Sequence, residues 1–140
     1  MRRVLGVFLV AVALLAVPAW ASAAIKITKI QYDPPGSDTG SNINQEYVVI
    51  KNTGGGAVSL KSWLLKDKAN HKYTFGTFKL GAGKSVTIHT GKGNDDRNDL
   101  YWGSGAYIWN NDGDKAFLKN AGGNTVDTCS YSGGGQYVNC

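Results

Sequence analysis

Hydrophobic and polar residues alternate along most of the chain beyond residue 24, and this spacing is typical of β-strands. In residues 85–90, Val86 and Ile88 alternate with Thr87 and His89, as in a strand that buries one face. Similar short segments occupy residues 25–30, 46–53, 58–60, 63–66, 72–75, 78–80, 107–109, 115–120 and 125–131. No long window beyond residue 24 has the apolar spacing of an amphipathic helix. The pattern therefore predicts an all-β domain.

Polar and glycine-rich turns separate the predicted strands. Asp33-Pro34-Pro35-Gly36 ends the first strand, because proline cannot donate to a β-ladder. Residues 36–45 have the composition of a polar connection, and residues 91–105 that of a loop with Leu100-Tyr101-Trp102 inside it. Asp112-Gly113 predicts a hairpin turn, because glycine tolerates positive φ. Short strands at such close spacing indicate an antiparallel β-sandwich of about seven to nine strands.

The N-terminal segment has the pattern of a signal peptide. Arg2 and Arg3 form a basic start, residues 4–17 form an almost unbroken apolar run, and Ala21-Ser22-Ala23 resembles a cleavage site. A helix that spans a bilayer needs about 20 apolar residues, so this run is short for an uncleaved membrane anchor, which is the alternative. We therefore predict a signal peptide at 1–23, a mature domain at 24–140 without a membrane span, and secretion.

The charge of the mature chain is modest. Removal of Arg2 and Arg3 with the signal peptide lowers the formal net charge from +5 to +3. The remaining lysines are spread along the sequence, as expected of solvated strand faces and protected sheet edges. Nucleic-acid sites gather their positive charge on one face of a protein, so this spread argues against a nucleic-acid partner.

Two cysteines, Cys129 and Cys140, lie near the C-terminus. In an oxidising compartment an even cysteine count favours a disulfide, and Gly133-Gly134-Gly135 lets the intervening chain fold back. We therefore predict a disulfide that closes the C-terminal tail. Two free thiols, or a bond to another chain, are the alternative. The paired Cys/His spacing that zinc requires is absent from the sequence.

Several segments together resemble the lamin tail domain, an immunoglobulin-like β-sandwich known from nuclear lamins and from secreted bacterial proteins. The matching segments, in the order of the family, are 46–52, 60–67, 73–75, 80–86, 109–118 and 123–127. Ser62 stands where the family often has Gly, and Ala82 where it often has Pro. The tail from Cys129 to Cys140 is additional to the family pattern. The resemblance implies an interaction module, of a kind that in bacteria often accompanies secreted or membrane-linked enzymes such as nucleases.

Residues 94–99 form an oxygen-rich segment. Asp95, Asp96 and Asp99 are candidate ligands for Ca²⁺, which favours carboxylate and carbonyl oxygens. The EF-hand spacing with its closing Glu is absent, and a solvated loop is the alternative. We otherwise expect no cofactor and no metal.

No catalytic constellation is present in the sequence. His71 and His89 are the two histidines, and each falls on a strand or turn position. No serine lies in the Gly-x-Ser-x-Gly turn of a nucleophile elbow. Since nucleophile, base and oxyanion donors are not assembled, we expect a protein that is not an enzyme.

The aromatic residues give the strongest binding signal. Tyr101, Trp102 and Tyr107 flank a Gly-Ser-Gly-Ala segment, where exposed rings can stack on sugars or anchor a protein. Trp63 and Trp109, on strand-like segments, are expected to fill the core. We predict a monomeric, secreted module for an unidentified protein or cell-envelope component. The alternatives are a glycan- or wall-binding module that uses Tyr101 and Trp102, and a nucleic-acid-binding adjunct to a separate secreted nuclease.

Overall fold

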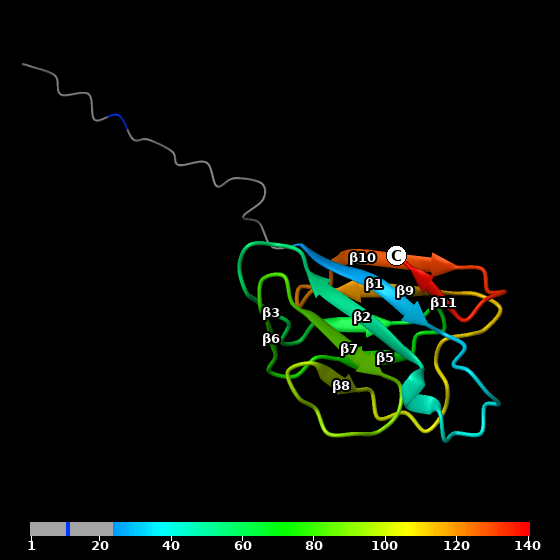
Figure 1. Cartoon of the computed structure of the whole chain (residues 1–140). Helices are drawn as coiled ribbons and strands as arrows, with labels where there is room; N and C mark the ends of the chain where they lie inside the picture. Colours follow the sequence, from blue (N-terminus) through cyan, green and yellow to red (C-terminus); the bar gives the residue numbers. More distant parts are fainter. Residues whose placement is uncertain (1–10, 12–23) are drawn as a thin grey trace, which may run out of the picture.

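Two main β-sheets and one short two-stranded sheet make up the fold in the computed structural model, which describes Ala11 and residues 24–140 (Figure 1). The strands are β1 (Ile25–Gln31), β2 (Tyr47–Asn52), β3 (Val58–Ser59), β4 (Leu64–Lys66), β5 (Lys72–Thr74), β6 (Lys79–Leu80), β7 (Ser85–His89), β8 (Asp99–Tyr101), β9 (Asp114–Lys119), β10 (Thr125–Tyr131) and β11 (Tyr137–Asn139), and a short 3-10 helix, η2, spans Ile43–Gln45. The signal-peptide prediction at 1–23 lies outside the described residues, apart from Ala11. Across the described residues, no helix has the length and apolar character needed to cross a membrane.

The strand order confirms the predicted sandwich and adds detail to it. The larger sheet has the order β11-β1-β2-β7-β8, the second sheet has the order β10-β9-β4-β5, and β3 pairs with β6. The pairs are antiparallel, except that β7 and β8 are parallel. Eleven strands exceed the expected number of about seven to nine. Two of them, β8 and β11, were not predicted as strands from the sequence pattern, and the two-residue strands β3 and β6 count separately.

The core lies between the two main sheets and follows the alternation in the sequence. Val48 and Ile50 of β2 point inward beside Val86 and Ile88 of β7, and none of the four is more than 1 % exposed. The facing sheet contributes Leu65, Ala116 and Leu118, which are fully buried. Trp109, at 2 % exposure, belongs to this core, as predicted, and Trp63 packs against it from a half-buried position.

One segment of the sequence is not the strand that its composition predicts. Residues 107–109 have no ladder partner, although Ile108 and Trp109 are buried. Their backbone N–H groups are satisfied by hydrogen bonds to a side chain, described below, rather than by pairing in a sheet. A turn forms at residues 110–113, with Gly113 at φ 131°, but it is not a hairpin because no strand precedes it. The predicted loop at 91–105, in turn, contains β8.

The predicted disulfide between Cys129 and Cys140 is present, with the two Cα atoms 5.8 Å apart. Cys129 lies on β10 of the four-stranded sheet, and Cys140 directly follows β11 of the five-stranded sheet, so the bond joins the two layers. The tail also bends at Gly133 (φ 82°), which lies against the backbone of Asn111 and Asp112 without room for a Cβ.

Hydrogen bonds of β1 also close the edge of the five-stranded sheet and link it to β10. A β-bulge interrupts the pairing of β1 between Ile27 and Lys29. The freed Ile27 N–H donates to Asp127 Oδ2 of β10 at 2.8 Å, and the Cys140 N–H donates to the Thr28 carbonyl at 3.0 Å. These contacts satisfy backbone groups that an open edge would leave unpaired.

We expect a Cys129→Ser, Cys140→Ser double variant to lower the free energy of unfolding by about 3 kcal/mol, because the bond closes a short loop and restrains the unfolded chain. Denaturant titration of the oxidised protein and of the variant measures this difference. Amide hydrogen exchange at Val138 and Ile30, which pair between β11 and β1, should accelerate in the variant. Unchanged unfolding and unchanged exchange would show that β11 is held without the bond.

Ser62 adopts φ 65°, in the left-handed region that favours glycine. Glycine is the residue that the family often has at this position, so Ser62→Gly removes a local strain. We expect the free energy of unfolding to rise by roughly 0.5–1 kcal/mol, as the relief exceeds the entropy cost of glycine. Ser59→Gly in β3 is the matched control and should be destabilising. A loss of stability in both variants would contradict this reading of Ser62.

Candidate functional site

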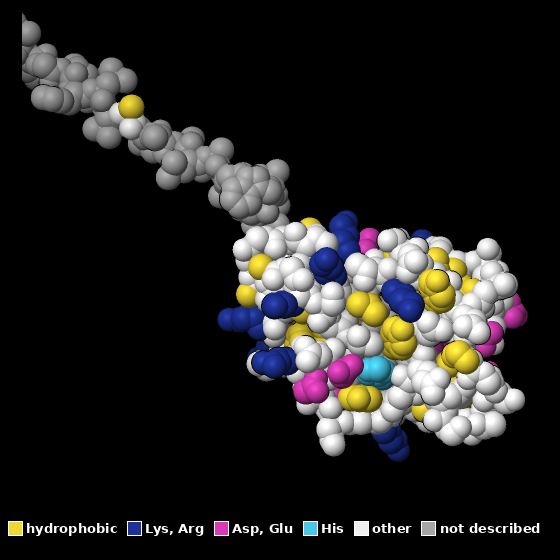
Figure 2. Space-filling view, in the orientation of Figure 1, with side chains coloured by type: hydrophobic (Ala, Val, Ile, Leu, Met, Phe, Trp, Pro, Cys, Tyr) yellow, Lys and Arg dark blue, Asp and Glu magenta, His cyan; other side chains and the backbone are white. Residues whose placement is uncertain are grey.

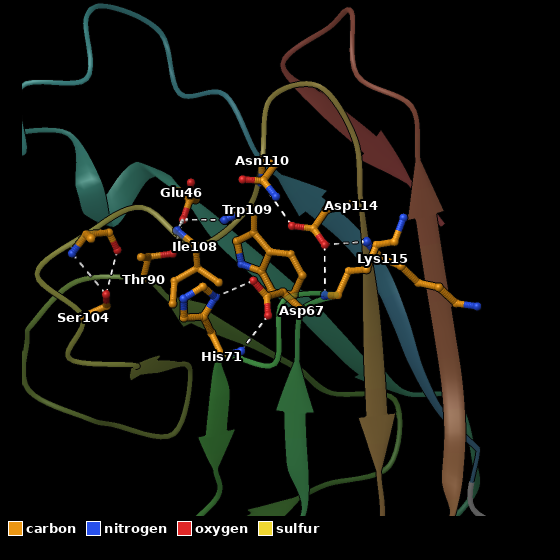
Figure 3. A network of polar contacts seen from close by, with 12 residues as sticks. Glu46, Asp67, His71, Thr90, Ser104, Ile108, Trp109, Asn110, Asp114 and Lys115 are labelled. Carbon is orange, nitrogen blue, oxygen red and sulfur yellow. Dashed lines mark hydrogen bonds and ion pairs between the residues drawn. The ribbon is translucent and has the colours of Figure 1, made fainter.

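A buried carboxylate holds the segment that crosses between the two sheets (Figure 3). Glu46 lies just before β2 and is completely buried. Its Oε1 atom accepts hydrogen bonds from the Thr90 hydroxyl at 2.7 Å, the Ile108 N–H at 2.8 Å and the Trp109 N–H at 3.3 Å. Glu46 therefore supplies the acceptor that a neighbouring strand would otherwise provide for residues 108 and 109.

Two further carboxylates support the same end of the sandwich. Asp114 Oδ1 accepts the N–H groups of Lys68 and Lys115, and its Oδ2 accepts the Asn110 N–H at 3.2 Å. Asp67 is fully buried and accepts the His71 N–H at 2.7 Å, while its other oxygen lies 2.6 Å from His71 Nδ1. Figure 3 shows the Trp109 ring among these carboxylates. The network is structural, since its acids are turned away from solvent.

Burial changes the acidity of Glu46. It raises the pKa of the carboxyl from 4.5 to about 7, although the hydrogen bonds from Ile108, Thr90 and Trp109 act in the opposite direction. The Oε2 atom is buried and has no hydrogen-bond partner, which adds to the cost of the charged form. A perturbed carboxyl in a cleft is a candidate catalytic acid, but Glu46 has no surface through which a substrate could reach it.

The outer face of the five-stranded sheet carries a row of planar side chains. Register places Tyr137, Gln31, Tyr47, His89 and Tyr101 opposite one another on the five successive strands. The inward residues on either side in sequence, such as Val48 and Ile88, are in the core, so this row faces outward. Figure 2 shows hydrophobic side chains, a histidine and a cation together on this face.

His89 is the fixed centre of the row. Its Nδ1 atom lies 2.6 Å from the Asn44 carbonyl and its Nε2 atom lies 2.8 Å from Asp99 Oδ1. The Tyr101 ring stacks on the imidazole with centroids 5.0 Å apart, and the Tyr47 ring meets it edge-on at 5.9 Å. Contacts on all sides therefore set the orientation of the imidazole.

A groove of about 480 Å³ opens beside His89, between η2 and the edge strand β11. Its polar lining includes Gln31, Gln45 and Gln136, and its aromatic lining is Tyr47 and Tyr137. The Lys29 ammonium donates to the Tyr47 hydroxyl at 3.0 Å and lies 4.6 Å from the centre of the Tyr137 ring. Tyr137 is 52 % exposed, which leaves much of its ring accessible to a ligand.

The structure separates the three aromatic residues that the sequence grouped as a binding site. Tyr101 braces His89 on the outer face, and it lies so close to Gly93 that a Cβ there would clash with the ring. Trp102 packs against the core, with its ring 6.2 Å from that of Trp109. The Tyr107 hydroxyl donates to Asn42 Oδ1 and accepts from the Gly40 N–H, at 3.2 Å from that nitrogen. A binding role for these residues stays a prediction.

The aspartates proposed as Ca²⁺ ligands have other partners. Asp96 Oδ1 accepts the N–H groups of Asn98 and Asp99, and these bonds hold the pKa of its carboxyl below the usual range. Asp95 Oδ1 accepts the Tyr101 N–H, and Asp99 bonds to His89. Among the described residues, no group of three His, Cys, Asp or Glu side chains is placed to hold a metal ion.

Sequence reasoning missed the groove and the buried acid. Tyr47 precedes alternating Val48, Val49 and Ile50, and this period-two pattern could have placed it on the outer face. Glu46 carried no such signal, because its partners, Ile108 and Trp109, are more than sixty positions away in the sequence. Tyr137 was overlooked because no apolar alternation marks β11 as a strand.

The pKa of Glu46 predicts how stability depends on pH. The unfolded chain releases this proton near pH 4.5 and the folded protein near pH 7. The contribution of Glu46 to the free energy of unfolding is therefore greatest below pH 4.5 and falls by roughly 3 kcal/mol as the pH rises through 7. Glu46→Gln keeps an oxygen acceptor and should flatten this part of the profile in denaturant titrations at several pH values. Asp112→Asn, at an exposed position, is the control; a Glu46→Gln profile that matches the wild type would overturn the assignment.

Comparison with known proteins agrees with the fold and the sequence segments described above. A family model described as Lamin Tail Domain matches residues 18–133, which include β1 to β10 and exclude β11 and Cys140. A search of curated proteins finds no match for the chain. Because the model spans most of the sequence and the strand architecture is the one expected, the chain belongs to the lamin tail domain family.

Proposed function

We propose that this lamin tail domain is a secreted, non-catalytic module that binds a glycan of the cell envelope in the groove beside Tyr137. The observation that carries the proposal is the exposure of Tyr137 at the rim of a groove lined by amide side chains. Lamin tail domains typically lack catalytic machinery, and the perturbed acid of this one is buried out of reach of any substrate.

The chemistry of the groove suits a neutral, hydroxyl-rich ligand. Each glutamine amide offers both a donor and acceptor sites, which matches the donor and acceptor character of sugar hydroxyls. Tyr137 offers an aromatic surface for the C–H face of a sugar ring and a hydroxyl that stays in contact with water. The groove lining contains no carboxylate, so a ligand there does not compete with an acid for the Lys29 ammonium.

The spacing of the tyrosines favours an extended polymer over a single sugar. Tyr137, Tyr47 and Tyr101 lie on every second strand of the row, with Gln31 and His89 between them. Two interstrand spacings amount to about 10 Å, which is close to the length of a disaccharide unit in an extended β-1,4-linked glycan. A protein partner is the second candidate, since an exposed tyrosine beside a cation is also typical of protein interfaces.

We expect the oxidised domain to co-sediment saturably with purified peptidoglycan at physiological salt, and soluble glycan fragments should compete. Tyr137→Thr keeps a strand-forming residue in β11 and should weaken binding at least about tenfold, as loss of a central aromatic contact does. Asn139→Thr, an outward position on the same strand and outside the groove lining, should bind like the wild type. Equal weakening in both variants, or no sedimentation of the wild type, would contradict the proposal.

A further inference from the structure

Five cations that are far apart in the sequence come together at one end of the outer face. Lys26, Lys51 and Ser85 lie opposite one another on β1, β2 and β7. Beside them, Lys79, Lys84 and Arg97 line a hollow of about 440 Å³. The dark-blue side chains in Figure 2 gather at the left-hand end of this face, where β1 begins. We call Lys26, Lys51, Lys79, Lys84 and Arg97 the basic strip.

The cations of the basic strip form no ion pair with the described residues of the protein. Within residues 24–140, the ion pairs that form involve the two histidines, and no lysine or arginine side chain is paired with a carboxylate. The lining of the hollow contains no acid. Asp95 and Asp96 line the neighbouring hollow together with Lys79 and Arg97. Each accepts backbone N–H groups of its own loop and forms no ion pair with these cations, although the charge of Arg97 contributes to the lowered pKa of the Asp96 carboxyl.

The donors around the hollow are those that recognise a phosphate group. Arg97 can present two parallel N–H groups to a phosphate, and Lys79 and Lys84 supply charge on flexible stems. The Ser85 hydroxyl and the Asn98 amide, which also line the hollow, are neutral donors. Lys51 and Lys26 continue the positive charge across two more strands, over about 10 Å. The strip therefore has room for successive phosphates of one polymer.

We propose that the basic strip binds the phosphate groups of a polyol-phosphate polymer of the cell envelope. Single-stranded nucleic acid is held largely by stacking of its bases on aromatic rings, and neither the hollow nor the row that extends it contains an aromatic side chain. Tyr73 and Phe78, which line the neighbouring hollow, are half-buried and pack against the core. A flexible polymer can lower one phosphate into the hollow, whereas the phosphates of a rigid duplex are fixed on a convex surface. The exposed Ser85 and Asn98 donors beside the cations also suit the hydroxyl groups that a polyol-phosphate carries between its phosphates.

This inference is independent of the glycan groove. The two sites share no lining residue, and they lie at opposite ends of the strands, since Lys51 stands four residues beyond Tyr47 on β2. Loss of one activity therefore does not imply loss of the other. Tyr137→Thr should leave phosphate-polymer binding intact, and variants of the strip should leave sedimentation with phosphate-free peptidoglycan intact.

Isothermal titration of the full domain with purified poly(glycerol phosphate) tests the proposal. Between about 50 and 200 mM salt the affinity should fall by at least about tenfold, as expected when several phosphates are neutralised. Lys84→Gln and Arg97→Gln should each weaken binding about fivefold, in line with the contribution of one cation near an anionic surface. Arg97→Lys should recover only part of the affinity that Arg97→Gln loses, because lysine keeps the positive charge but cannot make paired N–H contacts with a phosphate.

Lys72→Gln, an exposed lysine on β5 of the other sheet, is the matched control and should change the affinity little. Duplex DNA, a single-stranded oligonucleotide and vesicles with anionic lipid, at equal phosphate concentration, are the competing ligands. Tighter binding to any of these would overturn the assignment of the polymer. A control variant as weak as Lys84→Gln, or no binding at low salt, would overturn the site itself. Thermal unfolding of each variant confirms that the fold is retained.

Discussion

The hydrogen bonds that Glu46 accepts are the interaction on which this sandwich depends. The chain passes from β8 in one sheet to β9 in the other through a segment that has no strand partner, yet Ile108 and Trp109 must be buried there to close the core. A buried N–H group without an acceptor costs about 1–3 kcal/mol. Glu46 Oε1 removes this cost for both residues and binds Thr90 as well. The buried acid is thus the condition for placing Trp109 in the core.

Other carboxylates of the domain also accept backbone hydrogen bonds. Six of the ten acidic side chains accept backbone N–H groups, and they do so as backbone acceptors at turns, bulges and crossings: Glu46, Asp67, Asp95, Asp96, Asp114 and Asp127. None of these six acids also forms an ion pair with a lysine or arginine of the described residues. The described lysines and Arg97 have no carboxylate partners, and register gathers the five cations of the basic strip at one end of the outer face.

The sequence predicted the strands whose apolar and polar residues alternate locally. It failed where a residue is buried against a partner that is far away in the sequence. Val86 and Ile88 were placed correctly because a strand with one buried face repeats every two residues. Residues 107–109 were assigned to a strand because Ile108 and Trp109 are apolar, but a carboxylate from residue 46 takes the place of a ladder. The lysines looked dispersed because register, which brings Lys26, Lys51 and Ser85 side by side, is not visible in a single sequence. The Cys129–Cys140 bond was predicted from the even cysteine count and the expected oxidising compartment, and the bond is present.

The C-terminal tail shows how a short extension can add a surface to a shared fold. The family match ends at residue 133, and the chain beyond it forms β11, which pairs with β1 and is tied to β10 by the disulfide. Without this strand, β1 would be the edge of the sheet and Tyr137 would have no place beside Lys29. Tyr47 and Lys51 lie on the same face of β2, about 13 Å apart along the strand. An envelope polymer that carries both sugar rings and phosphates would therefore contact the groove and the basic strip together, and its second contact would act at high effective concentration and need little affinity of its own.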